Sequence, residues 1–422
     1  MSRPDVPRRV VVTGLGAVTP FGAGVDVLWS GLCVGRSAVR PVTRFAVEGM
    51  RTRIAAQVPE LPLPAGLEPR DAKRMDRFTL FALAAAGEAW RQAGFSAEAP
   101  DPYEAGVVIG SSHGGEETVV EGVRAIISEE PRRLSPWLIS RMLANMATAQ
   151  VAIRYGLHGP SFAVASACAT GAHAIGEAAE IIRRGDAEVM LAGASDACIT
   201  PLTLAGDAAA GALSTRNDDP ERASRPFDAD RDGFVVGEGA GVLVLEERAH
   251  ALARGTAILA ELSGYGTTTD ALHETRPDEY GSHLAHAIRR ALTKARLNAE
   301  DLDAVFAHAT GTPLGDRAET CALHAALGAV ATRVPIAAIK GALGHLMGAA
   351  GAVQAIAAIK ALELQMLPPS VNLETPDVSG LDLIGSAPRP TPLRHVLTNA
   401  AGFGGHNVAL ILSAPAADGR DG

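Results

Sequence analysis

Short runs of almost uniformly apolar residues alternate with segments of helical periodicity along the whole of this 422-residue chain. A strand that is apolar on both faces belongs to a sheet that is covered on both sides, because a solvent-facing strand would alternate apolar with polar residues. Strands and helices that alternate in this way are typical of an α/β protein. The predicted strands are residues 9–14, 106–110, 187–194, 242–245, 258–262, 304–307, 334–339, 395–398 and 408–412, and the clearest predicted helices are 70–94, 169–184 and 281–296.

The alternation continues without a stretch that would mark a linker. No Gly/Pro-rich segment divides the chain, and the second half repeats the succession of strands and helices seen in the first. We therefore expect two similar α/β halves that share one core, residues 1–255 and 256–415, rather than two independent domains. Residues 416–422 are expected to form a frayed tail.

Composition narrows the classes of function. The formal net charge of −9 argues against general binding to nucleic acid. The four cysteines are scattered without a C-x-x-C pair, so neither a metal site nor a disulfide framework is indicated. No signal peptide precedes Arg8, and no apolar segment of membrane-spanning length is free of glycine and charge. We expect a soluble, cytoplasmic protein with no metal and no membrane or nucleic-acid partner.

One cysteine lies at a predicted junction between a strand and a helix. The run from Phe162 to His173 begins as a short apolar strand, passes through small residues around Cys168 and continues into the predicted helix. A thiol at such a turn lies beside free backbone N–H groups and the positive end of the helix dipole, and both lower its pKa. The alternative is a buried structural thiol, which is what most free cysteines are. This stretch alone does not decide between the two.

Two histidines follow predicted strands of the second half in glycine-rich turns. His308 comes after the strand 304–307, and His345 comes after the strand 334–339. Loops at the carboxyl ends of strands are where α/β folds place their chemistry. A lone histidine is more often structural, but two such loops in a chain that also carries Cys168 favour a catalytic set.

Further groups would serve the same site. Lys340, five residues before His345, would place a positive charge beside a carboxylate, for which Asp316 and Glu319 are the candidates. The glycine-rich segment 402–407 offers backbone N–H donors suited to an oxyanion. By contrast, the glycines of the segment 13–16 are read as a turn that ends the first strand. They lack the third glycine and the following helix of a dinucleotide-binding loop.

Taken together, in order and with their spacing, these motifs resemble those of the β-ketoacyl-acyl carrier protein synthases. These are the elongating ketosynthases of type II fatty acid and polyketide pathways. The resemblance runs from about Arg9 to Leu412. It rests on Ser166-Ala167-Cys168-Ala169-Thr170-Gly171, Arg225-Pro226-Phe227-Asp228 with Asp232-Gly233-Phe234-Val235, the His308 loop, Lys340 with Gly344-His345, and Gly402-Phe403-Gly404-Gly405.

The resemblance implies a thiolase-type fold of two similar α/β halves in five αβαβα layers. It also implies that Cys168 takes the growing acyl chain from an acyl carrier protein as a thioester. His308 and His345 would contact the thioester carbonyl of a malonyl unit and assist its decarboxylation. The resulting carbanion would attack the acyl-cysteine and give a 3-ketoacyl product that is two carbons longer. The backbone N–H groups of Cys168 and Phe403 would form the oxyanion hole.

The remaining implied roles are supporting ones. Lys340 would orient the loops of the second half through Glu319 and Asp316. The substrates would be carried on the phosphopantetheine of an acyl carrier protein, with no other cofactor. The resemblance also implies a dimer, either a homodimer or a heterodimer with a chain-length-factor-like subunit.

The set Cys168, His308 and His345 separates this chain from related classes. A degradative thiolase would need a second cysteine late in the chain, and residues 402–407 contain none. A starter-type synthase would carry asparagine at the position of His345. A catalytically silent chain-length subunit would lack Cys168. A subunit of a heterodimer that only transfers or decarboxylates acyl groups would look the same at Cys168 and stays open.

Three residues depart from what the resemblance leads one to expect around the acyl pocket. His113 stands where a branched aliphatic residue is common, Asp207 where phenylalanine is usual, and Ala401 where an aromatic ring is usual. An aliphatic chain gains about 0.8 kcal/mol per buried CH₂, and polar walls would forfeit part of that gain. We hypothesise that the acyl chain is a polyketide or polyene intermediate of specialised metabolism. The alternatives are ordinary fatty-acid elongation, and a structure in which His113 and Asp207 satisfy each other away from the chain.

Acyl carrier proteins are acidic, so a ketosynthase of net charge −9 needs a local basic patch to bind one. Five basic residues match family positions near the pocket entrance. The alternative is that they form an ordinary solvated face. These residues are Arg70, Lys73, Arg74, Arg132 and Arg133.

Overall fold

The structure of the protein is a computed structural model that describes residues 8–95 and 101–415. The predicted frayed tail, 416–422, lies outside the described residues. One long sheet runs through the described part of the chain. Its first-half strands, in spatial order, are β1 (Val10–Thr19), β8 (Gly239–Glu247), β7 (Val189–Asp196), β5 (Ala105–Gly110) and β6 (Ser161–Phe162). Its second-half strands are β9 (Ala260–Thr269), β16 (His406–Ser413), β15 (His395–Gly402), β10 (Ala304–Phe306), β11 (Pro335–Ala337) and β13 (Asp382–Leu383).

The two halves repeat one pairing pattern. In the first half, β1, β8 and β7 pair antiparallel, and β7, β5 and β6 pair parallel. In the second half, β9, β16 and β15 pair antiparallel, and β15, β10 and β11 pair parallel. The halves join where β1 meets β9, at Val11–Glu261 and Val12–Ala260. The predicted alternation of strands is confirmed, since each predicted strand overlaps an observed one.

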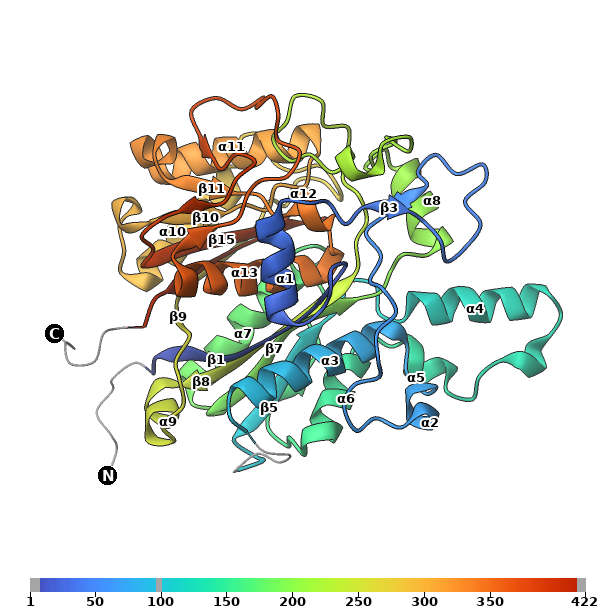
Figure 1. Ribbon diagram of the computed structural model, residues 1–422. Coiled ribbons are helices and arrows are strands. Elements are labelled where there is room, and N and C mark those ends of the chain that lie inside the picture. The colour runs from blue at the N-terminus through green and yellow to red at the C-terminus, as the bar shows by residue number, and fades with distance from the viewer. Residues whose placement is uncertain (1–7, 96–100, 416–422) are drawn as a thin grey trace.

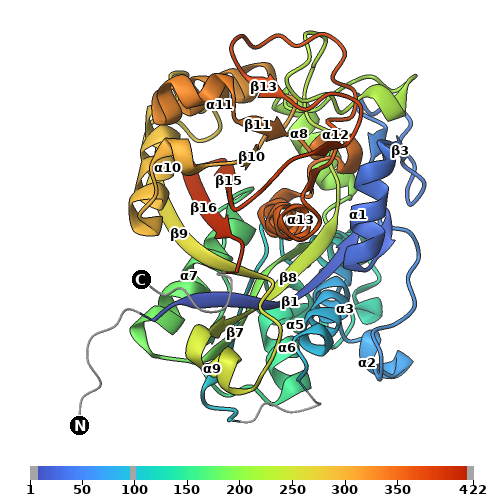
Figure 2. The same ribbon diagram turned by 60° about the vertical axis from the view of Figure 1, so that its left-hand side comes forward.

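Helices cover the sheet in three layers, which gives the αβαβα arrangement visible in Figure 2. The outer layer of the first half contains α3 (Arg77–Gln92) and α6 (Met146–Tyr155), and that of the second half contains α10 (Ser282–Ala295) and α11 (Pro313–Leu327). The central layer contains α7 (Thr170–Arg184) and α13 (Ala350–Leu364). This is the thiolase-type fold that the motifs predicted.

The apolar character of α13 follows from its central position. The segment Met347–Leu364 is long and apolar enough to cross a membrane by length and composition alone, and 89% of it is buried inside the protein. A helix with a sheet on each side has no solvent-facing side, so it is apolar all round.

The central helices approach each other closely enough to require glycine. A Cβ atom on Gly171 of α7 would lie 2.8 Å from the backbone nitrogen of Ala352, and one on Gly351 of α13 would lie 2.8 Å from that of Ala172. Backbone contact between α7 and α13 therefore explains part of the small-residue composition around Cys168. It also brings the starts of the two helices, one from each half, side by side.

Two predicted elements differ from the structure. The first strand does not end at a glycine turn, because β1 continues to Thr19. A Cβ on Gly14 would lie 2.1 Å from the carbonyl oxygen of Ala89, and one on Gly16 would lie 1.9 Å from that of Ala85. These glycines therefore let β1 pack directly on α3. They do not form a turn.

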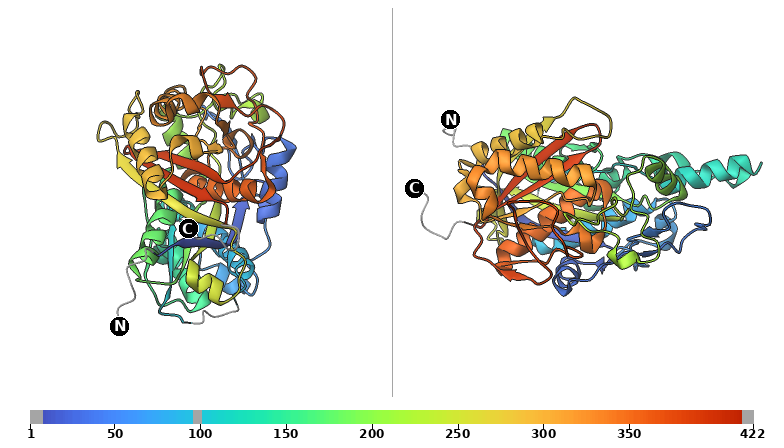
Figure 3. Two further views of the ribbon diagram at one scale, coloured as in Figure 1. Left: turned by 90° about the vertical axis from the view of Figure 1, so that its left-hand side faces the viewer. Right: turned by 90° about the horizontal axis from the view of Figure 1, so that it is seen from above.

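The predicted helix 70–94 is two helices, α2 (Pro69–Ala72) and α3. Asp76 separates them because its side chain caps α3 at Phe78 N and also accepts hydrogen bonds from Thr118. The helix α4 (Glu116–Ile127) extends away from the body of the molecule (Figures 1 and 3).

Candidate active site

Cys168 lies on a sharp turn directly before α7, as predicted. Its neighbour Ala167 has φ +48°, which costs a non-glycine residue about 1–2 kcal/mol. The turn is held by hydrogen bonds from Ser166 N to Thr170 Oγ1 (2.8 Å) and from Ala169 N to Ser166 O (3.1 Å). These bonds place the thiol at the N-terminus of the helix.

Residues from both halves meet in one cleft of about 390 Å³. Cys168 comes from the first half, and His308 and His345 come from loops after β10 and α12 (Lys340–Leu343) in the second. Ala401 and Phe403 line the same cleft. The structure therefore brings together the nucleophile candidate, the two histidines and the predicted oxyanion segment.

The two imidazole rings are perpendicular neighbours. Their centroids lie 5.6 Å apart at 88°. His345 is 1% exposed, and neither of its ring nitrogens has a hydrogen-bond partner in the described protein. Its backbone is fixed by Val235 O (2.7 Å) and Gly237 N (2.8 Å). Burial and then the nearby Lys340 charge hold the pKa of both histidines well below 6.5, so both rings are neutral at pH 7.

Lys340 and Glu319 support the His308 loop through its backbone. Lys340 Nζ donates to His308 O and, at 3.4 Å, to Gln354 Oε1. The Glu319 carboxylate accepts from the N–H groups of His308 (2.6 Å) and Ala309 (2.7 Å). Burial lowers the pKa of Lys340 to about 8, against the opposing effect of nearby negative charges. The lysine and the carboxylate therefore fix opposite sides of one loop.

Asp316 acts at a different place from the one predicted. Its carboxylate accepts from Phe227 N (2.7 Å) and Gly311 N (3.0 Å), which ties the 225–228 segment to the His308 loop. Burial raises the pKa of Asp316 to about 7. In the described part of the chain Lys340 has no hydrogen bond to Asp316 or to Glu319, and these carboxylates act on it through their charge alone.

The expected low pKa of the Cys168 thiol is wrong for the protein without substrate. Burial raises this pKa to about 12, and the charges of Asp207 and Asp196 add to the increase. The Lys340 charge and the backbone N–H of Phe403 act in the opposite direction but do not compensate. Loss of water around the sulfur outweighs the backbone donors on which the sequence prediction relied.

The predicted oxyanion segment is the tight turn between β15 and β16. Gly402 and His406 are the last paired residues of this hairpin, and Gly404 and Gly405 have φ +87° and +76°. A Cβ on Gly402 would lie 2.6 Å from Ser166 O and 3.1 Å from Cys168 N. The hairpin therefore rests directly on the Cys168 turn, and the backbone N–H of Phe403 lies close enough to the Cys168 sulfur to lower its pKa.

Of the three predicted acyl-pocket residues, His113 and Asp207 lie near each other, since the charge of His113 opposes the burial that raises the pKa of Asp207. Ala401 lines the open cleft, whereas His113 and Asp207 do not. His113 Nδ1 is 2.8 Å from Ser112 Oγ, and Asp207 Oδ2 is buried without a hydrogen-bond partner. Among the described residues His113 and Asp207 form no hydrogen bond or ion pair with each other. Asp207 nevertheless lies close enough to Cys168 to raise the pKa of its thiol.

Several residues of the site were missed from sequence. Thr310 and Thr312 line the cleft next to His308. Gln354 donates to Phe306 O (2.9 Å), Thr398 Oγ1 (2.7 Å) and Asn399 O (2.9 Å), and so joins α13 to the strands behind the site. A single amide in an otherwise apolar segment was the signal that would have identified Gln354.

One of the predicted docking residues has a printed contact with a neighbouring segment, and the others are known by their exposure. Arg74 stacks its guanidinium 4.7 Å from the centroid of the Trp137 ring, which brings α2 beside α5 (Leu138–Met142; Figure 1). Arg70 and Lys73 are exposed at α2, and Arg132 and Arg133 are exposed on the 3-10 helix Pro131–Arg133 that precedes α5. Arg77, by contrast, turns inward to Glu238 at 3.1 Å.

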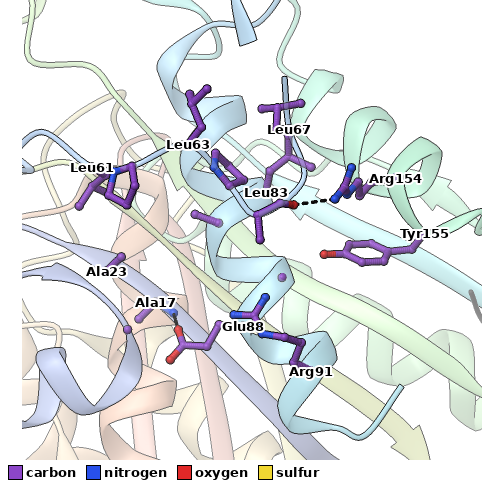
Figure 4. Close-up of a pocket in the computed structure, with 16 residues that line it drawn as sticks. Ala17, Ala23, Leu61, Leu63, Leu67, Leu83, Glu88, Arg91, Arg154 and Tyr155 are labelled. Atoms are coloured by element: carbon purple, nitrogen blue, oxygen red, sulfur yellow. Dashed lines mark hydrogen bonds between the residues drawn. The ribbon is translucent and has the colours of Figure 1, made fainter. Parts of the chain in front are cut away.

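A second cavity, of about 280 Å³, lies under the segment 61–67 (Figure 4). Two of its polar groups are already engaged: Glu88 accepts from Ala17 N and Val25 N, and Arg154 donates to Ala65 O and Gly66 O. Neither Cys168 nor the two histidines line this cavity, so the chemistry belongs to the other cleft.

Comparison with known proteins shows the family of the chain. The model of "Beta-ketoacyl synthase, N-terminal domain" matches residues 7–251, and that of "Beta-ketoacyl synthase, C-terminal domain" matches residues 259–374. The 3-oxoacyl-[acyl-carrier-protein] synthase 2 of Rhizobium meliloti is 45% identical over 96% of this chain and 98% of its own length. A putative polyketide beta-ketoacyl synthase 1 of Streptomyces cyaneus is 44% identical over 97% of this chain and 99% of its own.

Two solved structures extend the comparison. A type II polyketide ketosynthase, in complex with its acyl-carrier protein and bound to the hexaketide, matches with TM-score 0.89 at 32% identity, over 97% of this chain and 100% of that one. The ishigamide ketosynthase/chain length factor matches with TM-score 0.89 at 34% identity over the same shares. The chain therefore belongs to the beta-ketoacyl synthase family and is a 3-oxoacyl-[acyl-carrier-protein] synthase, an acyltransferase that carries out decarboxylative condensation.

Proposed function

We propose that Cys168 holds the acyl chain while His308 and His345 promote decarboxylation of malonyl-acyl carrier protein. In the first half-reaction the Cys168 sulfur attacks the acyl thioester, the bond to the pantetheine sulfur breaks, and the thiol proton ends on the departing pantetheine. The N–H groups of Cys168 and Phe403 donate to the oxyanion that forms between these events.

The second half-reaction uses the two imidazoles. The malonyl carboxylate leaves as CO₂, and its bonding pair forms an enolate whose oxygen accepts hydrogen bonds from His308 and His345. The enolate carbon attacks the acyl carbonyl on Cys168, and the carbon–sulfur bond breaks. The products are a 3-ketoacyl carrier, two carbons longer, and a thiolate that takes up a proton.

The unpartnered ring of His345 is the observation that carries this proposal. A buried imidazole normally satisfies its nitrogens, because an unmade hydrogen bond in the interior costs about 1–3 kcal/mol. His345 leaves both nitrogens without a protein partner and lies beside His308 in the cleft. A neutral ring has an N–H to donate, and an enolate oxygen is the acceptor that would use it.

Mass spectrometry of the protein after incubation with candidate acyl carriers tests the proposal. The expected result is an acyl adduct on Cys168 in the wild type, none in Cys168→Ala, and 3-ketoacyl product only when malonyl carrier is added to the wild type. Ketoacyl product from Cys168→Ala would contradict it. An adduct without ketoacyl product would favour the rival, a subunit of a heterodimer that transfers or decarboxylates acyl groups without condensing them.

For the acyl chain we propose a polyketide or polyene intermediate of specialised metabolism rather than a saturated fatty chain. The support is the polar group near the thiol: Asp207 Oδ2 has no hydrogen-bond partner among residues 8–95 and 101–415, and His113 makes its hydrogen bond to Ser112. The variant His113→Ile with Asp207→Phe should shift the preference from unsaturated or oxygenated acyl carriers toward saturated ones. An unchanged preference would favour housekeeping fatty-acid elongation.

For partners we propose an acidic acyl carrier protein on the α2/α5 face and a second synthase-like chain at the edge of the sheet. In the sheet formed by the described residues, β6 is an edge strand with one unpaired side, and its Phe162 is 44% exposed. Ile153, on the adjacent α6, is 72% exposed. Both a homodimer and a heterodimer with a chain-length-factor-like subunit fit this edge. We further propose a cytoplasmic location, where acyl carriers and reduced thiols are found.

A further inference from the structure

A hydrogen-bonded histidine connects the Cys168 turn to the rest of the site. His173 lies on the first turns of α7, and its Nδ1 is 2.7 Å from Ser166 Oγ. Its Nε2 is 2.8 Å from Thr267 Oγ1 on β9. A neutral imidazole donates through one nitrogen and accepts through the other, so both hydroxyls are satisfied together. Burial lowers the pKa of His173 to about 4, in keeping with a neutral ring.

The same ring also contacts the hairpin that carries Phe403. The rings of His173 and His406 lie edge to face with centroids 6.2 Å apart. His406 closes the hairpin opposite Gly402 and pairs with Thr269 of β9. Three segments thus converge on His173: the Cys168 turn, strand β9 and the Phe403 hairpin.

The segments that His173 joins carry the two N–H groups of the proposed oxyanion hole. The Cys168 N–H belongs to a turn with strained backbone at Ala167, which persists only where its surroundings hold it. The Phe403 N–H belongs to the hairpin whose Gly402 rests on that turn. No part of this connection passes through His308, His345 or Lys340, which are held by Glu319, Val235 and Gln354.

We propose that His173 is a positioning residue. Through Ser166, Thr267 and His406 it fixes the relative positions of the two N–H groups that form the oxyanion hole. This rests on the proposed function of Cys168 and Phe403, and it assigns His173 to the steps in which the acyl carbonyl at Cys168 is attacked. Decarboxylation of the malonyl unit, which would use the separately held imidazoles, does not depend on it. His173 touches no substrate in this scheme.

The test separates the two half-reactions. His173→Phe keeps an aromatic ring, although a larger one, and loses both hydrogen bonds. We expect acyl-Cys168 formation, followed by mass spectrometry, to slow about tenfold or more, since loss of one oxyanion donor costs about 10²–10³. CO₂ release from malonyl carrier, measured on protein whose Cys168 has been alkylated with iodoacetamide, should stay within about twofold of wild type.

Matched variants exclude a general loss of structure. His395→Phe removes a similar contact, Nδ1 to Ser413 Oγ at 2.8 Å, at the opposite end of the β15–β16 pair. It should leave both half-reactions unchanged. His173→Asn, whose amide replaces Nδ1 beside Ser166, should recover part of the acylation rate. Ser166→Ala should reproduce the acylation defect, and it serves as the test if His173→Phe does not fold.

The inference is overturned if acylation and decarboxylation fall by the same factor in His173→Phe, or if neither changes. It is also overturned if His395→Phe causes the same selective defect. If instead the proposed function of Cys168 is wrong, the wild type itself forms no acyl-Cys168, and this result distinguishes the two failures.

Discussion

The ammonium group of Lys340 donates to the backbone carbonyl oxygen of His308, while Glu319 accepts from the N–H of the same residue. One peptide segment is thus held at its donor and its acceptor by buried groups of opposite charge. The imidazole of His308 projects from this segment without being a partner in either contact. Its ring nitrogens therefore remain available to a ligand, while its backbone position is fixed.

This relationship predicts opposite pH trends for activity and stability. Burial lowers the pKa of Lys340 from 10.5 to about 8, so the lysine loses its charge above about pH 8. The rate of decarboxylation should fall as the pH rises through 8, because a neutral Lys340 holds the backbone carbonyl of His308 less strongly. Between pH 8 and 10.5 the unfolded chain binds more protons than the folded one, so this lysine's contribution to stability rises with pH. Rate and urea unfolding, measured at the same pH values, check both trends.

Lys340→Met is the control for this prediction. It should lower the decarboxylation rate at pH 7 and remove the fall above pH 8. If the decarboxylation rate of the variant still falls above pH 8, the fall is caused by the titration of another group.

Gly402 should tolerate no side chain. A Cβ there would lie 2.6 Å from Ser166 O, so Gly402→Ala must push the hairpin away from the Cys168 turn. We expect acyl-Cys168 formation to fall by about 10²-fold, the effect of losing one oxyanion donor. Gly385→Ala is the matched control, because nothing lies within 4 Å of its Cβ position. Stopped-flow acylation of both variants gives the comparison, and equal rates would contradict the arrangement.

The basic α2/α5 face should affect carrier binding without affecting chemistry. Lys73→Glu, on an exposed side chain, should raise KM for acyl carrier several-fold and leave kcat nearly constant, with an effect that shrinks at high salt. Arg333→Glu makes the same kind of exposed charge reversal in the second half, beyond α11, and should change neither constant. A fall in kcat with unchanged KM in Lys73→Glu would argue against docking at this face.

The edge strand β6 should form the subunit contact. Phe162→Asp replaces an exposed aromatic side chain on that edge strand with a charged one. In sedimentation velocity the variant should sediment as a monomer where the wild type sediments as a dimer, because a charge on an edge strand opposes pairing with a second chain. Leu364→Asp, at the end of α13 with a side chain 46% exposed, is the matched control and should leave the dimer intact. A dimer in both variants would place the interface elsewhere.

Local pattern was sufficient for the strands and for the position of Cys168. Each apolar run that was predicted as a strand overlaps an observed strand. A central strand buries both of its faces, so its residues are almost all apolar and can be recognised in the sequence. The elbow at Cys168 could be recognised because the small residues and the helical periodicity lie next to each other in sequence. The glycines at 14 and 16 were misread because their reason, the contact with Ala85 and Ala89 of α3, lies about seventy residues away.

The sequence by itself determined the α/β class with its two similar halves, and it predicted that Cys168, His308 and His345 belong to one site, where the structure places them in one cleft. Only the tertiary structure decided that Asp316 accepts its hydrogen bonds from Phe227 and Gly311 and acts on Lys340 by charge alone. It also decided that Asp207 keeps an oxygen near the thiol with no partner among the described residues, and that burial raises the thiol pKa to about 12. Hydrogen-bond partners and loss of water depend on which segments meet in space. Both the hydrogen-bond partners and the loss of water are set by residues far apart in the chain, so they cannot be predicted from local sequence pattern.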